Sequence, residues 1–339
     1  MKLKAIPLFL TMLLLLGACK KDDNNNDNNN NNNNNAANAF KDVKFDVVTY
    51  TSGGSLLYKN VYSYDGEKLK KVERTFSDQT TKYIWDYNYN GNIIEEIAGY
   101  NIMEYKSTEK YFKVEGDKTT EETTYTYIPV DGTLAGITKE VFEYTGGKLT
   151  VIRRYAAYDD EDDLKPTRLT SIFYNDNNFP VSVEYRVYDD GVLKDEVTAK
   201  DTFIYKDSKL IEYTTYFLNG DEYEATDKIL FTYNGNKLNT SEVYSYDFLL
   251  GKPTIDATNT YTYNSNNQIT TINQTGPSGS AKVEYTYKDG KSNLYMIVAP
   301  TLMRELGLTQ NLRKTEEETD KATRQSVREK ILPFYFFAL

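Results

Sequence analysis

The side chains that could carry chemistry in this chain are carboxylates and tyrosines, because two common reactive types are nearly missing. The 339 residues include no histidine and a single cysteine, Cys19. These counts exclude Ser-His-Asp and Cys-His nucleophilic sites, histidine-ligated metal centres and disulfides within the chain. Paired carboxylates could still hydrolyse a glycosidic bond, since that chemistry needs only Asp or Glu. With 50 acidic residues some pair always qualifies, so a glycoside hydrolase is the less favoured alternative.

The densest acidic segment, residues 159–163, could offer several carboxylate oxygens to a calcium ion. It lacks the EF-hand spacing, because the sixth position counted from Asp159 is Leu164, where that loop requires glycine. A solvated acidic loop is therefore favoured over a metal site. The sequence predicts no cofactor and no metal centre.

Three tyrosine–aspartate pairs share a spacing that suggests a binding site. Each lies 13 or 14 residues beyond an earlier tyrosine: Tyr158-Asp159 after Tyr144, Tyr188-Asp189 after Tyr174, and Tyr246-Asp247 after Tyr233. In neighbouring hairpins the pairs would form a row along one rim, with rings to stack on a sugar and carboxylates to accept its hydroxyl groups. The favoured alternative is structural: the tyrosines end an inward-facing wall and the aspartates cap the following turns.

The elements that would position these side chains come from a repeat. Each copy is an aromatic-x-aromatic strand, a tight turn rich in Asn, Asp, Gly and Lys, and a second strand that begins with an aliphatic residue. Clear copies begin at Tyr62, Tyr87, Phe142, Phe231 and Tyr285, weaker ones at Phe173, Phe203 and Tyr261, and a degenerate one lies at residues 114–118. Gly, Asn and Asp accept the positive φ of two-residue hairpin turns. Nine hairpins predict about eighteen strands over residues 39–295.

The alternation within each strand predicts one aromatic face and one charged face. In residues 282–288, Val283, Tyr285 and Tyr287 point one way and the charged residues between them the other. Trp85, the only tryptophan, shares the aromatic positions, which favours a core role over a ligand platform. After each turn two aliphatic residues fall three apart, as in Leu69 and Val72. Either both faces are partly covered there, or a β-bulge brings the two side chains together.

The fold class predicted is therefore all-β: a large antiparallel meander of about nine hairpins, forming a curled sheet or barrel with the rings on its concave face. Connections between hairpins are predicted to be longer and more polar than the turns within them. A transmembrane barrel has the same asymmetry, but the Lys, Glu and Thr face could not serve as a lipid-facing band. We therefore expect the sheet to face water.

The N-terminus has the pattern of an exported lipoprotein. Residues 1–18 combine Lys2 and Lys4 with a 12-residue apolar run that is too short to span a bilayer. Residues 19–38 follow as an Asn-rich tether, too polar to bury a core. Removal of residues 1–18 takes the net charge from −10 to −12, which disfavours nucleic acid as a partner.

Two resemblances refine these predictions. Residues 16–19, Leu-Gly-Ala-Cys, resemble a lipobox, which implies that Cys19 is lipidated, and the Lys-Lys-Asp-Asp that follows resembles the surface-export signal of Bacteroides-group lipoproteins. The Tyr-x-Tyr-Asn/Asp-Gly cadence resembles the YD (Rhs-type) repeat and, with the lipobox, Bacteroides-group lipoproteins of unknown function with a porin-like fold. The resemblance implies a curled sheet or shell and an outer-membrane protein at the cell surface, or alternatively one that faces the periplasm. It supplies no catalytic residues.

Residues 296–339 depart from the repeat and predict a helical C-terminal tail. A short helix follows Pro300, and a charged helix follows the capping box at residues 315–318. Taken together, the sequence favours a surface lipoprotein that binds glycans or other nutrients and is not an enzyme. The alternative is a structural or adhesive protein whose loops contact other proteins.

Overall fold

A computed structural model describes residues 43–78, 82–90, 93–100, 106–115, 118–128, 132–158, 160–247 and 252–289. The predictions for residues 1–38 and 296–339, and for Asp159, lie outside these residues. Within them the chain forms almost nothing but strands. The elements are β1 (Lys44–Ser52), β2 (Ser55–Asp65), β3 (Lys68–Phe76), β4 (Lys82–Asn90), β5 (Ile93–Tyr100), β6 (Lys106–Glu115), β7 (Lys118–Tyr127), β8 (Leu134–Thr145), β9 (Lys148–Ala157), the 3-10 helix η2 (Glu161–Asp163), β10 (Lys165–Tyr174), β11 (Pro180–Asp189), β12 (Val192–Leu193), β13 (Ala199–Lys206), β14 (Lys209–Asn219), β15 (Glu222–Asn234), β16 (Lys237–Asp247), β17 (Lys252–Tyr263), β18 (Ile269–Gly276) and β19 (Gly279–Lys288).

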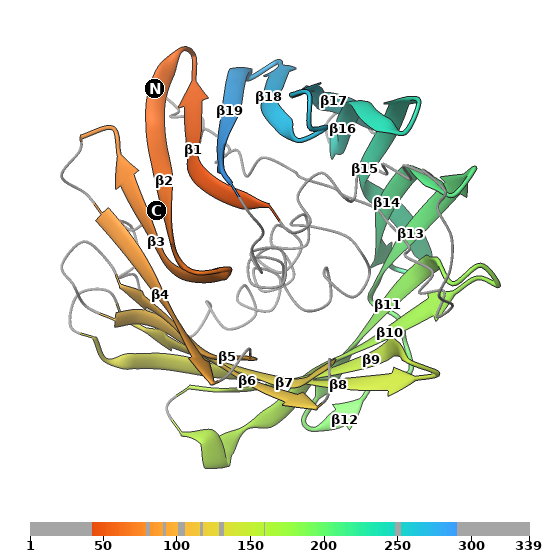
Figure 1. Cartoon of the computed structure of the whole chain (residues 1–339). Helices are drawn as coiled ribbons and strands as arrows, with labels where there is room; N and C mark the ends of the chain where they lie inside the picture. The colour runs from red at the N-terminus through yellow and green to blue at the C-terminus, as the bar shows by residue number, and fades with distance from the viewer. Residues whose placement is uncertain are drawn as a thin grey trace, which may run out of the picture.

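The strands close into an antiparallel barrel of eighteen strands (Figure 1). Each strand pairs with the next along the chain, and β19 pairs with β1, which also pairs with β2. The short β12 pairs only with the end of β11, and β13 takes the next place in the wall. The predicted all-β meander is confirmed, and the alternative left between a curled sheet and a barrel is decided by the pairing of β1 with β19.

A β-bulge explains the three-residue spacing of the aliphatic residues. In the hairpin of β2 and β3, Ser63 pairs with Lys71 and Tyr64 with Leu69, so that Lys70 is the extra residue. The same register shift immediately before the turn recurs in seven other hairpins. Because of the bulge Leu69 and Val72 reach the same face, where they are 0% and 5% exposed.

The connections at the other rim only partly match the prediction of long loops. Asn219 pairs with Glu222, so the connection at Gly220 is a tight two-residue turn. At Asp190 and Gly191 both φ angles are positive, at 50° and 77°, and the chain turns there directly into β12. The acidic composition of these two segments thus reflects the needs of tight turns, whose positive φ Gly and Asp tolerate.

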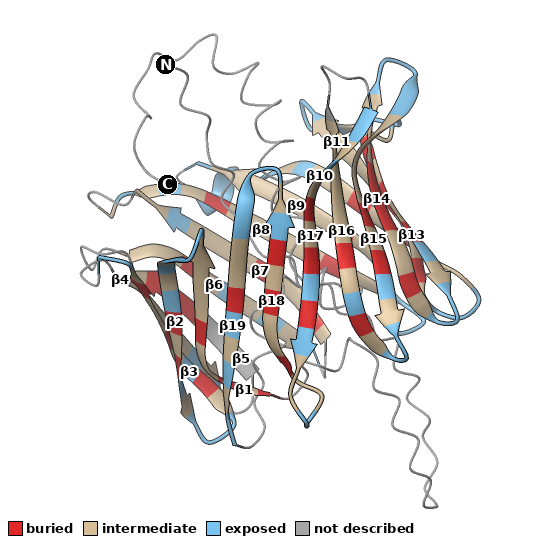
Figure 2. Ribbon diagram, turned by 90° about the horizontal axis from the view of Figure 1, so that it is seen from above, coloured by how far each residue is buried: buried red, intermediate tan, exposed pale blue. Residues whose placement is uncertain are grey.

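The core lies on the inner wall of the barrel. Its buried members alternate along the strands and include Phe45, Leu149, Val183, Ile229 and Ile272, with partly buried tyrosines packed against them. Side chains on the concave face of a closed sheet converge and cover one another, whereas those on the convex face splay apart. Figure 2 shows the resulting bands, with buried positions recurring along β15, β17 and β18 between more exposed ones. No helix in the described ranges is long and apolar enough to cross a bilayer.

Candidate functional site

Tyrosine hydroxyl groups fasten each hairpin to the one before it. Six of them donate to the backbone oxygen of the first or second residue in the second strand of the preceding hairpin. The donor and acceptor residues are Tyr89 and Leu69 (2.8 Å), Tyr144 and Thr119 (2.9 Å), Tyr174 and Leu149 (2.8 Å), Tyr233 and Leu210 (2.9 Å), Tyr263 and Leu238 (2.9 Å), and Tyr287 and Ile269. We call this set the tyrosine latches. Because each hydroxyl group is bonded to the backbone and each ring packs against the core, these tyrosines form part of the wall and do not serve as a ligand platform.

Lysines complete five of the latches. The residue before the acceptor is a lysine whose ammonium group lies over the latch ring, as with Lys118 over Tyr144 at 4.8 Å and Lys148 over Tyr174 at 5.2 Å; Lys68, Lys209 and Lys237 are placed likewise at 5.3–5.6 Å. A cation over a ring contributes about 0.5–1 kcal/mol at an exposed site. In four of these five latches the lysine and the acceptor form a Lys-Leu pair directly after the turn, whereas residues 118–119 are Lys-Thr. The Lys-Leu pair is therefore a sequence signal of a latch.

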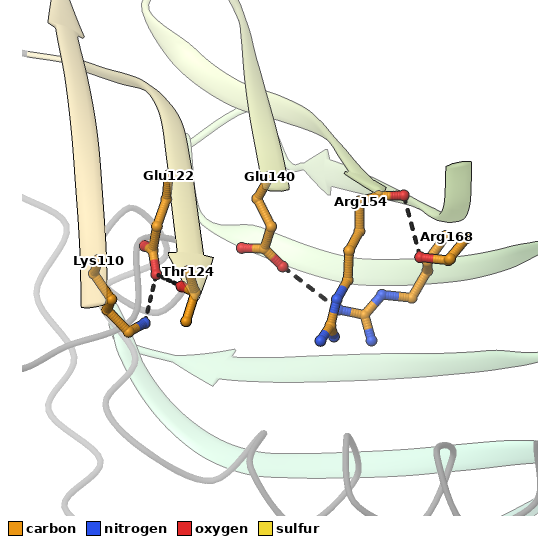
Figure 3. Close-up of polar contacts among 7 residues, drawn as sticks. Lys110, Glu122, Thr124, Glu140, Arg154 and Arg168 are labelled. Atoms are coloured by element: carbon orange, nitrogen blue, oxygen red, sulfur yellow. Dashed lines mark hydrogen bonds and ion pairs between the residues drawn. The ribbon is translucent and has the colours of Figure 1, made fainter. Parts of the chain in front are cut away.

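A polar belt lies on the same inner face, farther from the tight turns than the latches. On β6 and β7 the Lys110 ammonium group lies 2.5 Å from Glu122, which also accepts from Thr124 (Figure 3). On β8 and β10, Glu140 and Arg168 lie 3.9 Å apart. Glu122 pairs across strands with Glu140, which pairs with Arg154, and Arg154 pairs with Arg168. The belt is therefore continuous over five strands.

The most deeply buried charged residue of the described ranges is Asp201 on β13, beyond the belt, which is 1% exposed. Tyr185 donates to its Oδ2 at 2.7 Å and Thr215 to its Oδ1 at 2.8 Å. Burial raises the pKa of Asp201 from 3.8 to about 6, and the hydroxyl groups of Tyr185, Thr215 and Tyr213 oppose part of that rise. Both carboxylate oxygens are occupied and water is excluded, so Asp201 ties three strands together and does not meet a substrate.

The structure places two of the three predicted tyrosine–aspartate pairs near each other and the third far away. Tyr158, just beyond β9, is 80% exposed, and Tyr188 lies on β11, two strands away, or about 10 Å. Tyr246 lies on β16, a further four strand spacings or about 19 Å beyond β11. Tyr158 and Tyr188 are thus near neighbours along the rim, while Tyr246 is remote from both.

The aspartates of these pairs differ as well. The Asp189 carboxylate lies 2.8 Å from the ammonium group of Lys194, across the turn into β12. Asp247 ends β16 opposite Lys252, and its side chain, like the whole of Asp159, lies outside the described atoms. Glu143 and then Tyr188 raise the pKa of Arg153, which places the Tyr188 ring beside that outer-wall cation.

The acidic segment folds as a cap and not as a cage. The Asp160 carboxylate accepts from the backbone N–H of Asp162 at 3.0 Å and so caps η2. Within the described ranges, no group of three or more Cys, Asp or Glu residues is placed to hold a metal ion.

The outer wall carries ion pairs around much of the barrel. Lys71 and Glu73 flank the buried Val72, and Lys282 and Glu284 flank the buried Val283, so both pairs point outward. Their N–O distances are 3.3 and 2.6 Å. Further pairs join Lys113 and Lys139 to Glu121, Arg153 to Glu143, Arg186 to Glu184 and Lys228 to Glu212. A wall of this kind suits water and not hydrocarbon.

Comparisons with known proteins give matches among solved structures only. No protein-family model matches the chain, and a search of curated proteins finds no match. A porin-like protein from Bacteroides vulgatus is 11% identical, with 73% of this chain and 99% of that chain covered and a TM-score of 0.39. A porin-like protein from Bacteroides uniformis is 12% identical, with coverage of 72% and 98% and a TM-score of 0.31. The TcdB2-TccC3 structure is 10% identical, with coverage of 72% and 19% and a TM-score of 0.19.

Proposed function

We propose that this chain is an outer-membrane lipoprotein whose barrel stands outside the bilayer and binds glycans at its rim. The observation that carries the proposal is the outer wall of ion pairs, exemplified by Lys282 and Glu284 at 2.6 Å. A Lys or Arg at the bilayer midplane on the lipid face of a barrel costs about 2–4 kcal/mol. A barrel with this wall needs another attachment, and lipidated Cys19 would provide it.

Tyr158 and Tyr188 are the residues proposed to bind the ligand. An exposed ring beside a second ring at about 10 Å can hold successive sugars of a glycan, and Asp189 can accept a hydroxyl group. The long connection after β9 and the β11–β12 hairpin project these groups from a rigid wall, which is how binding residues are commonly presented.

The attachment is tested with Cys19→Ala. We expect this variant to remain an unlipidated precursor and to leave the membrane fraction, as followed by incorporation of a labelled fatty acid and by fractionation. Labelled lipid on Cys19→Ala, or retention of the variant in the outer membrane, would contradict the proposed anchor.

Binding is tested on a glycan array with the double variant Tyr158→Ala/Tyr188→Ala. We expect it to lose signals that the wild-type barrel gives, while its melting temperature changes little. Phe173→Ala is the matched control, because Phe173 is an aromatic residue of the outer wall that is 46% exposed. Equal signals from the double variant and the control would show that Tyr158 and Tyr188 do not bind the glycan.

One observation favours the second candidate, a protein that contacts other proteins. Large apolar side chains are exposed on the outer wall: Leu57, Phe173, Ile204 and Ile255, each at 42–48%. They lie on four different strands that are not neighbours in the barrel. They therefore do not form one apolar patch, and glycan binding is the favoured function. An array without any glycan signal would favour this second candidate.

A further inference from the structure

We propose that Arg74, on the inner wall, binds the carboxylate group of an acidic sugar. This inference rests on the proposed binding function for its class of ligand, but it uses none of the rim residues. The site is formed by β2, β3 and β4, where Arg74 lies among aromatic rings.

Three contacts fix the guanidinium group. Its Nε donates to the Asn60 Oδ1 at 3.0 Å, and Asn60 is 6% exposed. Its central carbon lies 4.3 Å from the ring centroid of Tyr58 and 5.2 Å from that of Trp85. Arg74 itself is half-buried. The contacts hold the planar fork in one orientation, so little conformational entropy remains to be lost when a ligand binds.

Arg74 differs from Arg153, Arg168 and Arg186 in its electrostatic partners. The guanidinium groups of Arg153, Arg168 and Arg186 have carboxylate oxygens at 2.6, 3.9 and 3.2 Å. For Arg74 no carboxylate of the described residues lies within 4.0 Å, and no hydrogen bond among those residues uses its two terminal nitrogens. These nitrogens carry four N–H donors in the geometry that pairs with a carboxylate in two parallel bonds.

The surroundings indicate what else the ligand carries. Aromatic rings run side by side on both sides of Arg74: Tyr50 and Tyr58 stack at 4.3 Å, Phe76 lies 5.7 Å from Tyr58 and 5.6 Å from Tyr83, and Tyr83 lies 6.3 Å from Trp85. A few polar groups amid apolar and aromatic surface are typical of small-molecule sites. A pyranose with a carboxylate group matches both the aromatic rings and the guanidinium group. Its C–H face can cover a ring while its carboxylate pairs with Arg74.

Gly99 lets Trp85 and Thr108 pack directly against the backbone of β5. A Cβ at this position would lie 2.5 Å from the Thr108 Oγ1 and 3.1 Å from the Trp85 Cδ1. A side chain here would push the indole, which holds one side of Arg74. The absence of a side chain at Gly99 thus preserves the position of the ring.

Trp85 also provides the measurement. It is the only tryptophan, so the intrinsic fluorescence of the mature, detergent-solubilised lipoprotein reports on this site. Oligogalacturonate, its fully methyl-esterified form and inorganic phosphate are titrated separately. We expect saturable change with the free acid, at least about tenfold weaker binding of the ester, as the loss of one charged hydrogen-bonded pair implies, and weakening by added salt.

Variants decide whether Arg74 is responsible. Arg74→Gln is expected to weaken the free acid at least about tenfold, and Arg74→Lys to give an intermediate loss because it keeps the charge without the fork. Lys282→Gln, on the outer wall and paired there with Glu284, is the control and should bind as wild type. If Arg74→Gln does not fold by circular dichroism, Arg74→Lys decides alone.

Three results would overturn the proposal: no saturable change with the free acid, equal affinity for acid and ester, or equal affinity of the Arg74 variants and wild type. Phosphate binding as tightly as the acid would also overturn it, because the site would then recognise small anions and not an acidic sugar. Signals on the array from neutral glycans alone would contradict this inference and leave the proposed function standing.

Discussion

The buried carboxyl group of Asp201 predicts a distinct dependence of stability on pH. Asp201 is 1% exposed, and burial raises its pKa from 3.8 to about 6. The folded chain therefore binds this proton more tightly than the unfolded chain does. The contribution of Asp201 to stability is fully present below about pH 4 and is lost as the pH rises through about 6.

The size of the effect follows from the shift. Each pKa unit corresponds to about 1.4 kcal/mol, so a rise of about two units makes the folded state about 3 kcal/mol less stable at neutral pH than it is with Asp201 protonated. In a domain of this size 1 kcal/mol changes the melting temperature by about 2–4 °C. The expected effect of Asp201 is thus about 6–12 °C.

Asp201→Asn isolates this effect, because asparagine stays neutral at every pH. Melting temperatures of wild type and variant are measured between about pH 4 and pH 8, and the difference between them is plotted. We expect wild type to lose stability relative to Asp201→Asn as the pH rises, although the amide accepts one hydroxyl hydrogen bond fewer, at a constant cost of about 1 kcal/mol. Asp195→Asn, at an exposed loop residue, is the control and should change stability by less than about 0.5 kcal/mol. A difference between wild type and Asp201→Asn that does not vary with pH would refute the argument.

Two further changes test the hairpins. Tyr233→Phe removes the hydroxyl group that donates to the Leu210 oxygen at 2.9 Å, and it should lower the free energy of unfolding in denaturant by about 1 kcal/mol. The control is Tyr158→Phe, which should have no measurable effect because Tyr158 is 80% exposed. Equal losses in the two variants would contradict the latch. Gly235 has a φ of 59° with open space around it, so Gly235→Val should cost about 1–3 kcal/mol through backbone strain alone, and an unchanged melting temperature would place the turn elsewhere. Gly136→Ala is the control, because its Cβ would lie at an ordinary 3.5 Å from the Ala157 oxygen.

The local parts of the fold could be predicted from sequence, whereas its closure could not. Tight turns, alternation and the spacing of Leu69 and Val72 are encoded within a few residues, so they predicted the hairpins and offered the bulge as one of two explanations. Closure depends on the pairing of Lys44 with Lys288 and of Tyr50 with Val283. No local pattern reports that pairing, since it joins residues more than 200 positions apart and depends on the summed twist and register of every strand between them.

The same reasoning explains what was missed in the site. Asp201 lies two residues from the buried Phe203 on β13, and Arg74 lies two residues from the buried Val72 on β3. Alternation along a strand alone could therefore have placed both charged residues on the inner wall. What alternation cannot provide is the neighbour across the next hairpin. Asp201 meets Thr215 through the register of β13 with β14, and Tyr185 through the register of β11 with β13. A shared spacing along the sequence therefore does not determine which residues lie together: Tyr158 and Tyr188 are near neighbours along the rim, whereas Tyr246 is remote from both.

Residues of the inner wall near the tight turns have a different role from those nearer the other rim, and this difference determines which of them can bind a ligand. Near the tight turns the latch hydroxyl groups are bonded to backbone oxygens and their rings cover aliphatic residues such as Leu69 and Ile269, both 0% exposed. A ligand that competed for those groups would loosen the wall itself. Nearer the other rim, Asp201 has its oxygens occupied, but the guanidinium of Arg74 is held without a carboxylate. The rings around Arg74 are already ordered in the folded barrel. An anion that binds the Arg74 guanidinium group therefore needs little further rearrangement of the protein. Binding at this height of the wall is therefore compatible with stability, whereas binding at the latches is not.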